Sequence, residues 1–222
     1  MHSAIVVFPG SNCVAEMERF LEAYFKQKPA MIWHKDTNVP EADLYVLPGG
    51  FSYGDYLRAG ALASISPVME AIKKKVKKGN KVLGICNGFQ ILCETKLLPG
   101  TLRINDNKTK GPKMPIGTIY RNFICKSVLL EPHDYLMPSV LLEPHDYLIP
   151  IAHGEGNYYH SRPKSVNVAF TYKDNPNGSV NDIAGIFNKK GNVLGMMPHP
   201  ERAFEDYHCS QDGYKVLDMF IQ

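Results

Sequence analysis

The chain has 222 residues, a length that fits one generous domain or two small ones, and its content of 44% hydrophobic and 21% charged residues is that of a globular protein. The formal net charge of +3 is too small to predict nucleic-acid binding. The five cysteines are odd in number and include no Cys-x-x-Cys pair, which argues against a disulfide framework or a zinc knuckle and indicates a reducing compartment.

The chain shows no targeting or membrane segment. Residues 4–8 are apolar but follow no basic leader, and no apolar run approaches the roughly 20 residues that cross a bilayer. We therefore expect a cytoplasmic protein that binds neither membrane nor nucleic acid. The densest basic run, residues 73–78, precedes Gly79 and is interpreted as the solvated end of a helix rather than a phosphate- or partner-binding patch.

The first half alternates strands and helices. A helical pattern follows the first strand, with apolar residues at three- and four-residue spacing from Met17 to Phe25. A second helix is predicted over residues 67–78, and a third begins directly after residue 85. This alternation predicts an α/β fold with a mostly parallel sheet covered by helices on both faces. Its buried strands are expected at residues 4–8, 30–33, 44–47 and 81–85.

The second half is richer in strand patterns. Residues 189–192 predict a hairpin turn between two strands, and a closing helix is expected from about residue 212 to residue 220. The predicted strands cover residues 166–172, 183–188 and 193–197. We treat residues 1–222 as one domain with an irregular, atypical segment at 103–150.

That segment contains a tandem duplication. Residues 127–138 and 139–150 differ only in Met137 and Ile149. Two copies do not make a solenoid, and a proline inside each copy disfavours pairing in a central strand. The paired histidines and aspartates could suggest a metal site, but we favour a duplicated surface segment that weakens stability. These residues are His133, Asp134, His145 and Asp146, and the prolines are Pro132 and Pro144.

The strongest local signal for chemistry is residues 84–88, Gly-Ile-Cys-Asn-Gly, where a strand ends and a helix begins. This is the cysteine form of a nucleophile elbow, in which small residues permit a tight turn. The new helix directs its free amides and positive dipole end at the sulfur of Cys86, which favours the thiolate. The amide of Asn87 would supply half of an oxyanion hole. The alternative is a buried structural cysteine.

A catalytic thiolate needs a base, and two His-x-Glu pairs are candidates. Pro200 pushes His199 into extended geometry, so Glu201 can lie on the same side and hold the ring. His153 and Glu155 are separated by a glycine and form a weaker candidate. The pair at 199–201 also follows a predicted strand, near the sheet edge that carries the elbow. We therefore favour His199 as the base, although taken alone it is more often a structural histidine.

Residues 47–55 form a glycine-rich loop after another predicted strand. Paired glycines let backbone amides approach a ligand, and Gly50 is the natural second donor of an oxyanion hole. The alternative is a plain turn. The loop does not end in Lys-Ser or Lys-Thr, so a nucleotide P-loop is not predicted.

Together these motifs resemble the class I (triad) glutamine amidotransferases. Residues 84–90 match the elbow of that family, which has a glutamine four residues after the cysteine, and residues 197–202 match its base and orienting group. Within the family, the chain is most similar to the small glutaminase subunits of phosphoribosylformylglycinamidine synthase. That similarity covers roughly residues 3–100 and 150–222, with specific segments at 8–13, 49–60, 151–156, 175–179 and 183–202.

The resemblance implies a flavodoxin-like three-layer sandwich and a glutaminase. Cys86 would attack L-glutamine, release ammonia and form a glutamyl thioester, with His199 as acid and base and Glu201 as its orienting group. Gly50 and Asn87 would supply the oxyanion amides. His153 and Glu155 belong to a family motif whose role stays open.

The resemblance also implies partners. Gln90 would help to hold the substrate. Ammonia would pass to a synthetase subunit of the PurL type, which uses ATP and Mg²⁺ to convert formylglycinamide ribonucleotide to its amidine, and a small PurS-type subunit would bridge the two. This chain itself would need no cofactor and no metal. Two rival hypotheses are a cysteine hydrolase or chaperone-like protein of similar fold and a binding module without catalysis.

Overall fold

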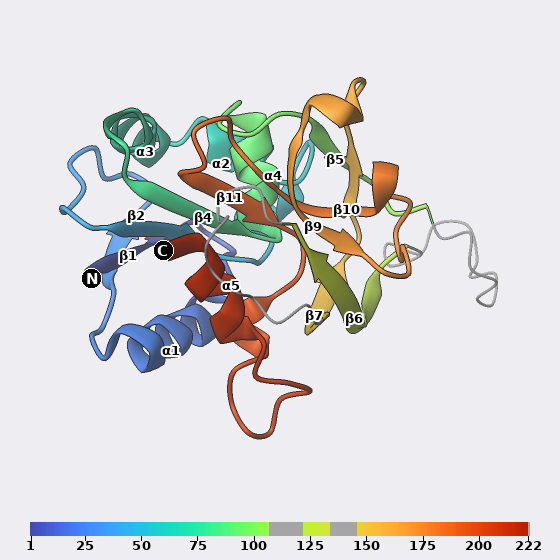
Figure 1. The fold of residues 1–222 in the computed structure, drawn as a ribbon. Coiled ribbons are helices and arrows are strands. Elements are labelled where there is room, and N and C mark those ends of the chain that lie inside the picture. Colours follow the sequence, from blue (N-terminus) through green and yellow to red (C-terminus); the bar gives the residue numbers. More distant parts are fainter. Residues whose placement is uncertain (107–121, 134–145, 222) are drawn as a thin grey trace.

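The computed structural model describes residues 1–106, 122–133 and 146–221 (Figure 1). Its centre is a nine-stranded sheet in the order β2-β1-β3-β4-β11-β10-β9-β6-β7. The first five strands of this order run parallel, and the remaining four continue the sheet antiparallel. The bounds are β1 (Ser3–Val7), β2 (Ala30–Trp33), β3 (Leu44–Leu47), β4 (Lys81–Ile85), β6 (Ile124–Pro132), β7 (Tyr147–His153), β9 (Asn167–Tyr172), β10 (Ile183–Phe187) and β11 (Val193–Met196).

Helices cover both faces of the parallel half, so the predicted three-layer α/β architecture is confirmed. On one face α1 and α5 lie side by side, with the rings of Phe20 and Tyr214 stacked at a centroid distance of 5.6 Å. The other face carries α2, α3 and α4 (Figure 1). The helices are α1 (Val14–Phe25), α2 (Ala61–Ser64), α3 (Pro67–Lys78), α4 (Asn87–Glu94) and α5 (Gly213–Ile221); β5 (Thr101–Arg103) and β8 (Asn157–Tyr159) form a separate small sheet.

The parallel strands are apolar runs because both of their faces are covered. Every residue of β3 and β11 is buried, as are four of the five residues of β4. The helix α3 begins with Pro67 at its first turn and ends at Gly79, whose φ of +102° lets the chain leave the helix. The hairpin predicted at residues 189–192 is confirmed, since Phe187 and Leu194 are paired across it.

The duplicated region departs from prediction. The prediction of an irregular segment at 103–150 is wrong for residues 124–132 and 147–150, which lie in β6 and β7. Within the repeat, these two strands are paired from Ser127↔Pro150 to Leu130↔Tyr147. Alternate side chains point into the core: Val128, Leu130, Tyr147 and Ile149 are buried, whereas Leu129 is 44% exposed.

Two prolines are tolerated here for positional reasons. Pro132 is the last residue of β6, and Pro150 lies in β7, which is the edge strand of the sheet. The metal-site alternative finds no support at the described residues, because His133 contacts the Thr171 hydroxyl at 2.9 Å and Asp146 pairs with Lys173 at 3.4 Å. Asp134, Pro144, His145 and the polar stretch 107–120 lie outside the described residues.

Among the described residues, no helix is both long enough and apolar enough to span a bilayer.

The repeat allows a test of its cost to stability. Deleting residues 134–145 joins 127–133 to 146–150, which together form one complete copy. The connection between Leu130 and Tyr147 then shortens from residues 131–146 to four residues, a common hairpin length. Lys173 lies within 3.7 Å of Glu131 and 3.4 Å of Asp146, so the two ends of the deletion are already close.

We expect the deletion to preserve the pairing of β6 with β7. The free energy of unfolding should rise by about 1 kcal/mol, because loop closure costs ~0.6 kcal/mol for each doubling of loop length. Urea denaturation of both chains measures this difference. A lower midpoint in the shortened chain would contradict the prediction.

Candidate active site

The sharp turn at Cys86 joins β4 to α4. Cys86 adopts φ 52° and ψ −105°, a backbone conformation that L-residues rarely populate and that often marks functional sites. Glycines on both sides make the turn possible. A Cβ at Gly84 would lie 2.4 Å from a methyl carbon of Leu92, and one at Gly88 would lie 1.9 Å from the carbonyl oxygen of Leu47. The spacing of small residues in the motif thus follows from the close approach of α4 to β3 and β4.

Strand pairing brings His199 beside Cys86. The strands β4 and β11 are parallel neighbours, with Met196 opposite Ile85, so the residues that follow both strands meet at one edge of the sheet. The amide of Cys86 donates to the carbonyl of Met196 at 2.8 Å. A Cβ built on Gly49 would lie 2.8 Å from Cε1 of His199 and 3.5 Å from Cβ of Cys86, so both side chains converge on that point.

His199 and Glu201 form a buried pair. The distance between Nδ1 of His199 and Oε1 of Glu201 is 2.6 Å, and the two residues are only 1% and 0% exposed. The backbone amide of His199 donates to the carbonyl of Pro150 at 2.8 Å, which anchors it to β7. Its Nε2 is buried without a hydrogen-bond partner among the described residues. This nitrogen is therefore available to exchange a proton with the neighbouring sulfur.

Charge distinguishes the two candidate histidines. Burial opposes protonation of His199, but the Glu201 carboxylate, together with the sulfurs of Cys86 and Cys13, outweighs it and raises its pKa well above the ordinary value. His153 has no such partner among the described residues. Burial and the neighbouring His199 lower its pKa to about 3, so its ring stays neutral. The ring nitrogens of His153 make no hydrogen bond to Glu155, so only residues 199 and 201 form a base with an orienting carboxylate.

The glycine-rich loop lies against the turn after β1. Gly50 adopts φ +138°, and a Cβ there would lie 2.4 Å from the amide nitrogen of Asn12. The next residue, Phe51, donates its amide to the carbonyl of Gly10 at 2.8 Å. In the described chain, no hydrogen bond to a protein acceptor uses the backbone amides of Gly50 and Asn87. Two unoccupied donors near Cys86 are what an oxyanion hole requires.

An amide network links the loop, α4 and the segment after β7. The side-chain oxygen of Asn87 accepts the amide of Ser52 at 3.1 Å, and its nitrogen donates to Gln90 Oε1 at 2.8 Å. Gln90 in turn donates to the carbonyl of Glu155 at 2.7 Å. Gln90 lines the cavity described next, but its hydrogen bonds serve to position the neighbouring walls.

Cys86 opens into a cavity of about 610 Å³, within the range of small-molecule sites. Gly50 and Gln90 also line it, whereas Asn87, His199 and Glu201 are buried beside it. Two carboxylates face this cavity, Asp55 and Glu155. Burial and, to a lesser extent, the nearby charge of Glu155 raise the pKa of Asp55 to about 6, against the opposing effect of a hydrogen bond from Asn87.

Sequence reasoning assigned no role to Cys13, Arg202 or Asp55. A guanidinium nitrogen of Arg202 donates to the sulfur of Cys13 at 3.1 Å. Ligand atoms of Cys13, His199 and Glu201 lie within 4.8 Å of one another, and all three residues are buried. The contact of His199 with Glu201 and the bond from Arg202 to Cys13 account for this arrangement. Cys13 lies after β1 and Cys86 lies after β4, and parallel strands end at the same edge of the sheet. The sequence therefore held a signal that could have placed Cys13 near the active site.

A comparison with protein families shows what kind of protein this chain is. Residues 1–220 match the model of the CobB/CobQ-like glutamine amidotransferase domain. The chain belongs to this family. As a glutamine amidotransferase it is an enzyme that hydrolyses glutamine, and the resemblance drawn from its motifs is confirmed.

Solved structures agree with the assignment. A chain of the PurLQS structure from Thermotoga maritima is 39% identical, with a TM-score of 0.85 over 99% of this amidotransferase and 97% of that chain. A GMP synthase-like protein from Thermoplasma acidophilum has a TM-score of 0.62 at 16% identity, covering 100% of this chain and 92% of that one. A glutamine amidotransferase from Thermotoga maritima has a TM-score of 0.58 at 17% identity, covering 91% and 77%. The last two show the shared flavodoxin-like fold alone.

Cavity access predicts which thiol of this amidotransferase reacts with a substrate-like reagent. Cys86 lines the cavity, whereas Cys13 and Cys93 are buried and do not line it, and Cys125 and Cys209 are exposed on the surface. We expect an electrophilic glutamine analogue to modify Cys86 alone, and excess glutamine to block that adduct. Iodoacetamide should instead modify Cys125 and Cys209 whether or not glutamine is present.

Peptide mass spectrometry distinguishes these outcomes. An adduct of the glutamine analogue on Cys13, or labelling of Cys86 that glutamine does not reduce, would contradict the prediction. The Cys86→Ser variant serves as the control and should remain unlabelled by the analogue.

Proposed function

We propose that this chain is the glutaminase subunit of phosphoribosylformylglycinamidine synthase in purine biosynthesis. The observation that carries the proposal is the buried His199–Glu201 pair beside Cys86, which lines a cavity and lies near the unoccupied amides of Gly50 and Asn87. The 39% identity to a chain of PurLQS over nearly the full length of both supports the specific assignment.

The first half-reaction follows from this geometry. The sulfur of Cys86 attacks the side-chain amide carbon of glutamine while His199 holds the thiol proton on Nε2. The oxygen of the tetrahedral intermediate carries the negative charge, which the amides of Gly50 and Asn87 stabilise. His199 then gives its proton to the departing nitrogen, the carbon–nitrogen bond breaks, and ammonia leaves a glutamyl thioester on Cys86.

The second half-reaction regenerates the enzyme. His199 removes a proton from water as the water oxygen attacks the thioester carbon. The same two amides stabilise the second oxyanion. The carbon–sulfur bond then breaks, His199 returns the proton to the sulfur, and glutamate is released. Glu201, which contacts Nδ1 of His199, stabilises the protonated ring in both half-reactions.

The carboxylates in the cavity supply substrate recognition. Glutamine carries an α-ammonium group, and Asp55 and Glu155 are the acidic residues of the cavity lining. A cation between them would relieve the repulsion that raises the pKa of Asp55. Gln90 fixes the wall that carries Glu155 through its bond to that carbonyl.

The ammonia would be consumed by a partner. We propose a PurL-type synthetase subunit, which uses ATP and Mg²⁺, and a small PurS-type bridging subunit, as the match to PurLQS supports. The proposed reaction of this chain uses no cofactor, metal, nucleic acid or membrane, and it would take place in the cytoplasm.

The decisive experiment compares two nitrogen sources in the reconstituted complex. We expect Cys86→Ala to abolish amidine formation from glutamine but to preserve formation from ammonium chloride, because only ammonia generation is lost. Loss of both activities, together with intact assembly by gel filtration, would contradict the division of labour. Glutamine-dependent activity retained by Cys86→Ala would overturn the proposal.

Glu201→Gln tests the orienting carboxylate. An amide cannot stabilise the protonated ring, so we expect kcat to fall by about 10³- to 10⁴-fold. The pKa of His199 should fall as well, because the Glu201 charge is what raises it against burial. Glutaminase kinetics and NMR titration of the ring measure the two effects. Glu155→Gln is the matched control, since it should raise KM and leave kcat within a few fold.

The raised pKa of Asp55 predicts that the affinity for glutamine depends on pH. With a pKa of about 6, Asp55 is ionised above pH 6 and neutral below it, so the KM for glutamine should rise as pH falls through 6. Asp55→Asn should raise KM about tenfold at pH 8, the cost of one charge-assisted hydrogen bond, and should remove this inflection. Steady-state kinetics from pH 5 to 8 measure both, with the exposed Asp174→Asn as control. An unchanged inflection in Asp55→Asn would contradict the assignment.

A further inference from the structure

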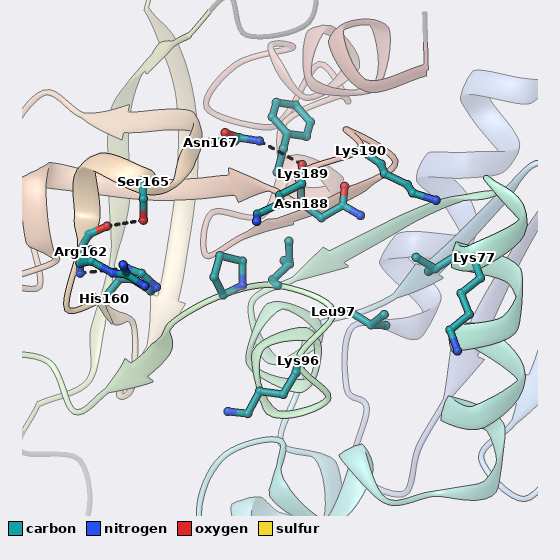
Figure 2. Close-up of a pocket in the computed structure, with 14 residues that line it drawn as sticks. Lys77, Lys96, Leu97, His160, Arg162, Ser165, Asn167, Asn188, Lys189 and Lys190 are labelled. Atoms are coloured by element: carbon teal, nitrogen blue, oxygen red, sulfur yellow. Dashed lines mark hydrogen bonds between the residues drawn. The ribbon is translucent and has the colours of Figure 1, made fainter.

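A second cavity lies away from the glutamine site. Its volume is about 700 Å³, and it shares no lining residue with the cavity at Cys86. Its walls come from the end of α3, the segment after α4, the segment between β8 and β9, and the β10–β11 hairpin (Figure 2). Cys86 follows the last residue of β4, whereas the hairpin precedes the first residue of β11. The two cavities therefore lie at opposite ends of the parallel strands, one at their carboxyl ends and the other at their amino ends.

The charges lining this second cavity are all positive. Five residues carry permanent cationic charge, and none of the described aspartates or glutamates lines the cavity. None of the five cations forms an ion pair within the described part of the chain. Figure 2 places Arg162 on one side, Lys77 and Lys190 on the other, and Lys189 between them. The five cations are Lys77, Lys96, Arg162, Lys189 and Lys190.

This arrangement changes the interpretation of the basic run at residues 73–78. Lys77 is the one lysine of that run that lines the cavity. The other four cations come from segments far apart in sequence. Two helix C-termini also lie at this edge, at α3 and α4, and each contributes about half a negative charge. Five full positive charges outweigh them.

Other polar groups of the cavity are also suited to an anion. The backbone amide of Arg162 donates to Nδ1 of His160 at 3.1 Å, so Nδ1 is an acceptor and Nε2 presents a further donor. Ser165 donates to the carbonyl of Arg162 at 2.8 Å, which closes this turn. The left side of Figure 2 shows these three residues together.

The walls are held in place by buried hydrogen bonds. The side-chain amide of Asn192, which is 9% exposed, donates to the carbonyls of Val76 at 2.9 Å and Asn80 at 3.0 Å. It thereby ties the hairpin to the end of α3. Asn167 donates to the carbonyl of Asn188 at 3.3 Å, which ties the same hairpin to β9. The backbone segments that carry the cations are therefore fixed relative to one another, which lowers the entropic cost of binding.

The floor between the cations is apolar. Its accessible surface belongs to the half-buried Leu97 and the exposed Pro99, which lie over the buried side chains of Val76, Leu98 and Phe187. An inorganic anion would use the charges but leave this surface uncovered. A molecule that combines a flat apolar body with several phosphates would use both.

We propose that this cavity binds a nucleoside polyphosphate. The phosphates lie among Lys189, Lys190, Lys77 and Arg162, and the nucleoside covers the floor at Leu97 and Pro99. The site is independent of the glutamine cavity and of the identity of the partner synthetase.

The test is isothermal titration calorimetry of the full chain with ATP, inorganic tripolyphosphate and adenosine. We expect ATP to bind more tightly than tripolyphosphate, and adenosine to bind most weakly. Higher salt should weaken ATP binding, because the attraction is electrostatic and screened. The double variant Lys189→Glu/Lys190→Glu should weaken ATP binding at least about tenfold.

The matched control is Lys35→Glu/Lys74→Glu. It changes the net charge equally, and Lys74 lies on α3 without lining the cavity. It should alter ATP affinity by less than about twofold. Lys96→Glu/Arg162→Glu repeats the test from the opposite wall if the first variant folds poorly by thermal melt.

Three outcomes would overturn the proposal. The first is the absence of ATP binding. The second is equal weakening by the control variant, which would indicate attraction to overall charge. The third is equal affinity for ATP and tripolyphosphate, which would show that the apolar floor is not used.

Discussion

The pairing of β4 with β11 is the constraint on which the active site depends. Parallel pairing in one register makes both strands end at the same edge, so the residues that follow them are neighbours although 113 positions separate Cys86 from His199. The bond from the Cys86 amide to the Met196 carbonyl continues the ladder into the turn itself. The strained backbone of Cys86 is therefore held by the sheet on one side and by the buried helix α4 on the other.

The two buried histidines have opposite protonation properties because only one of them lies beside a carboxylate. A buried imidazolium is costly unless a charge stabilises it, and Glu201 supplies that charge for His199 at 2.6 Å. His153 is equally enclosed but lacks such a partner in the described chain, so the same burial keeps it neutral. A proton-accepting base and a neutral wall residue thus arise from one residue type, according to the presence of a single carboxylate.

The two edges of the sheet carry cavities of opposite charge. The cavity beside Cys86 is lined by two carboxylates, whereas the cavity at the hairpin is lined by five cations. A zwitterionic amino acid and a polyanion would therefore be sorted to different ends of the molecule by electrostatics alone. Asn192 and Gln90 hold the respective walls through buried side-chain amides that bond to backbone carbonyls.

The sequence by itself determined the features that depend on local chemistry. Periodicity located most strands and helices, and the elbow at residues 84–88 required its glycines because a Cβ at Gly84 or Gly88 would clash. The motifs were sufficient to identify the family, because each motif is a short segment whose residues act together.

Tertiary structure decided what depends on burial and on contacts between distant segments. It separated the two His-x-Glu pairs, because only Glu201 lies against its histidine. It placed the described residues of the repeat in β6 and β7, because their alternating apolar side chains are buried in the core despite the prolines. It also assembled the cationic cavity from four segments, which no local pattern could reveal, because the proximity of those charges exists only in the folded chain.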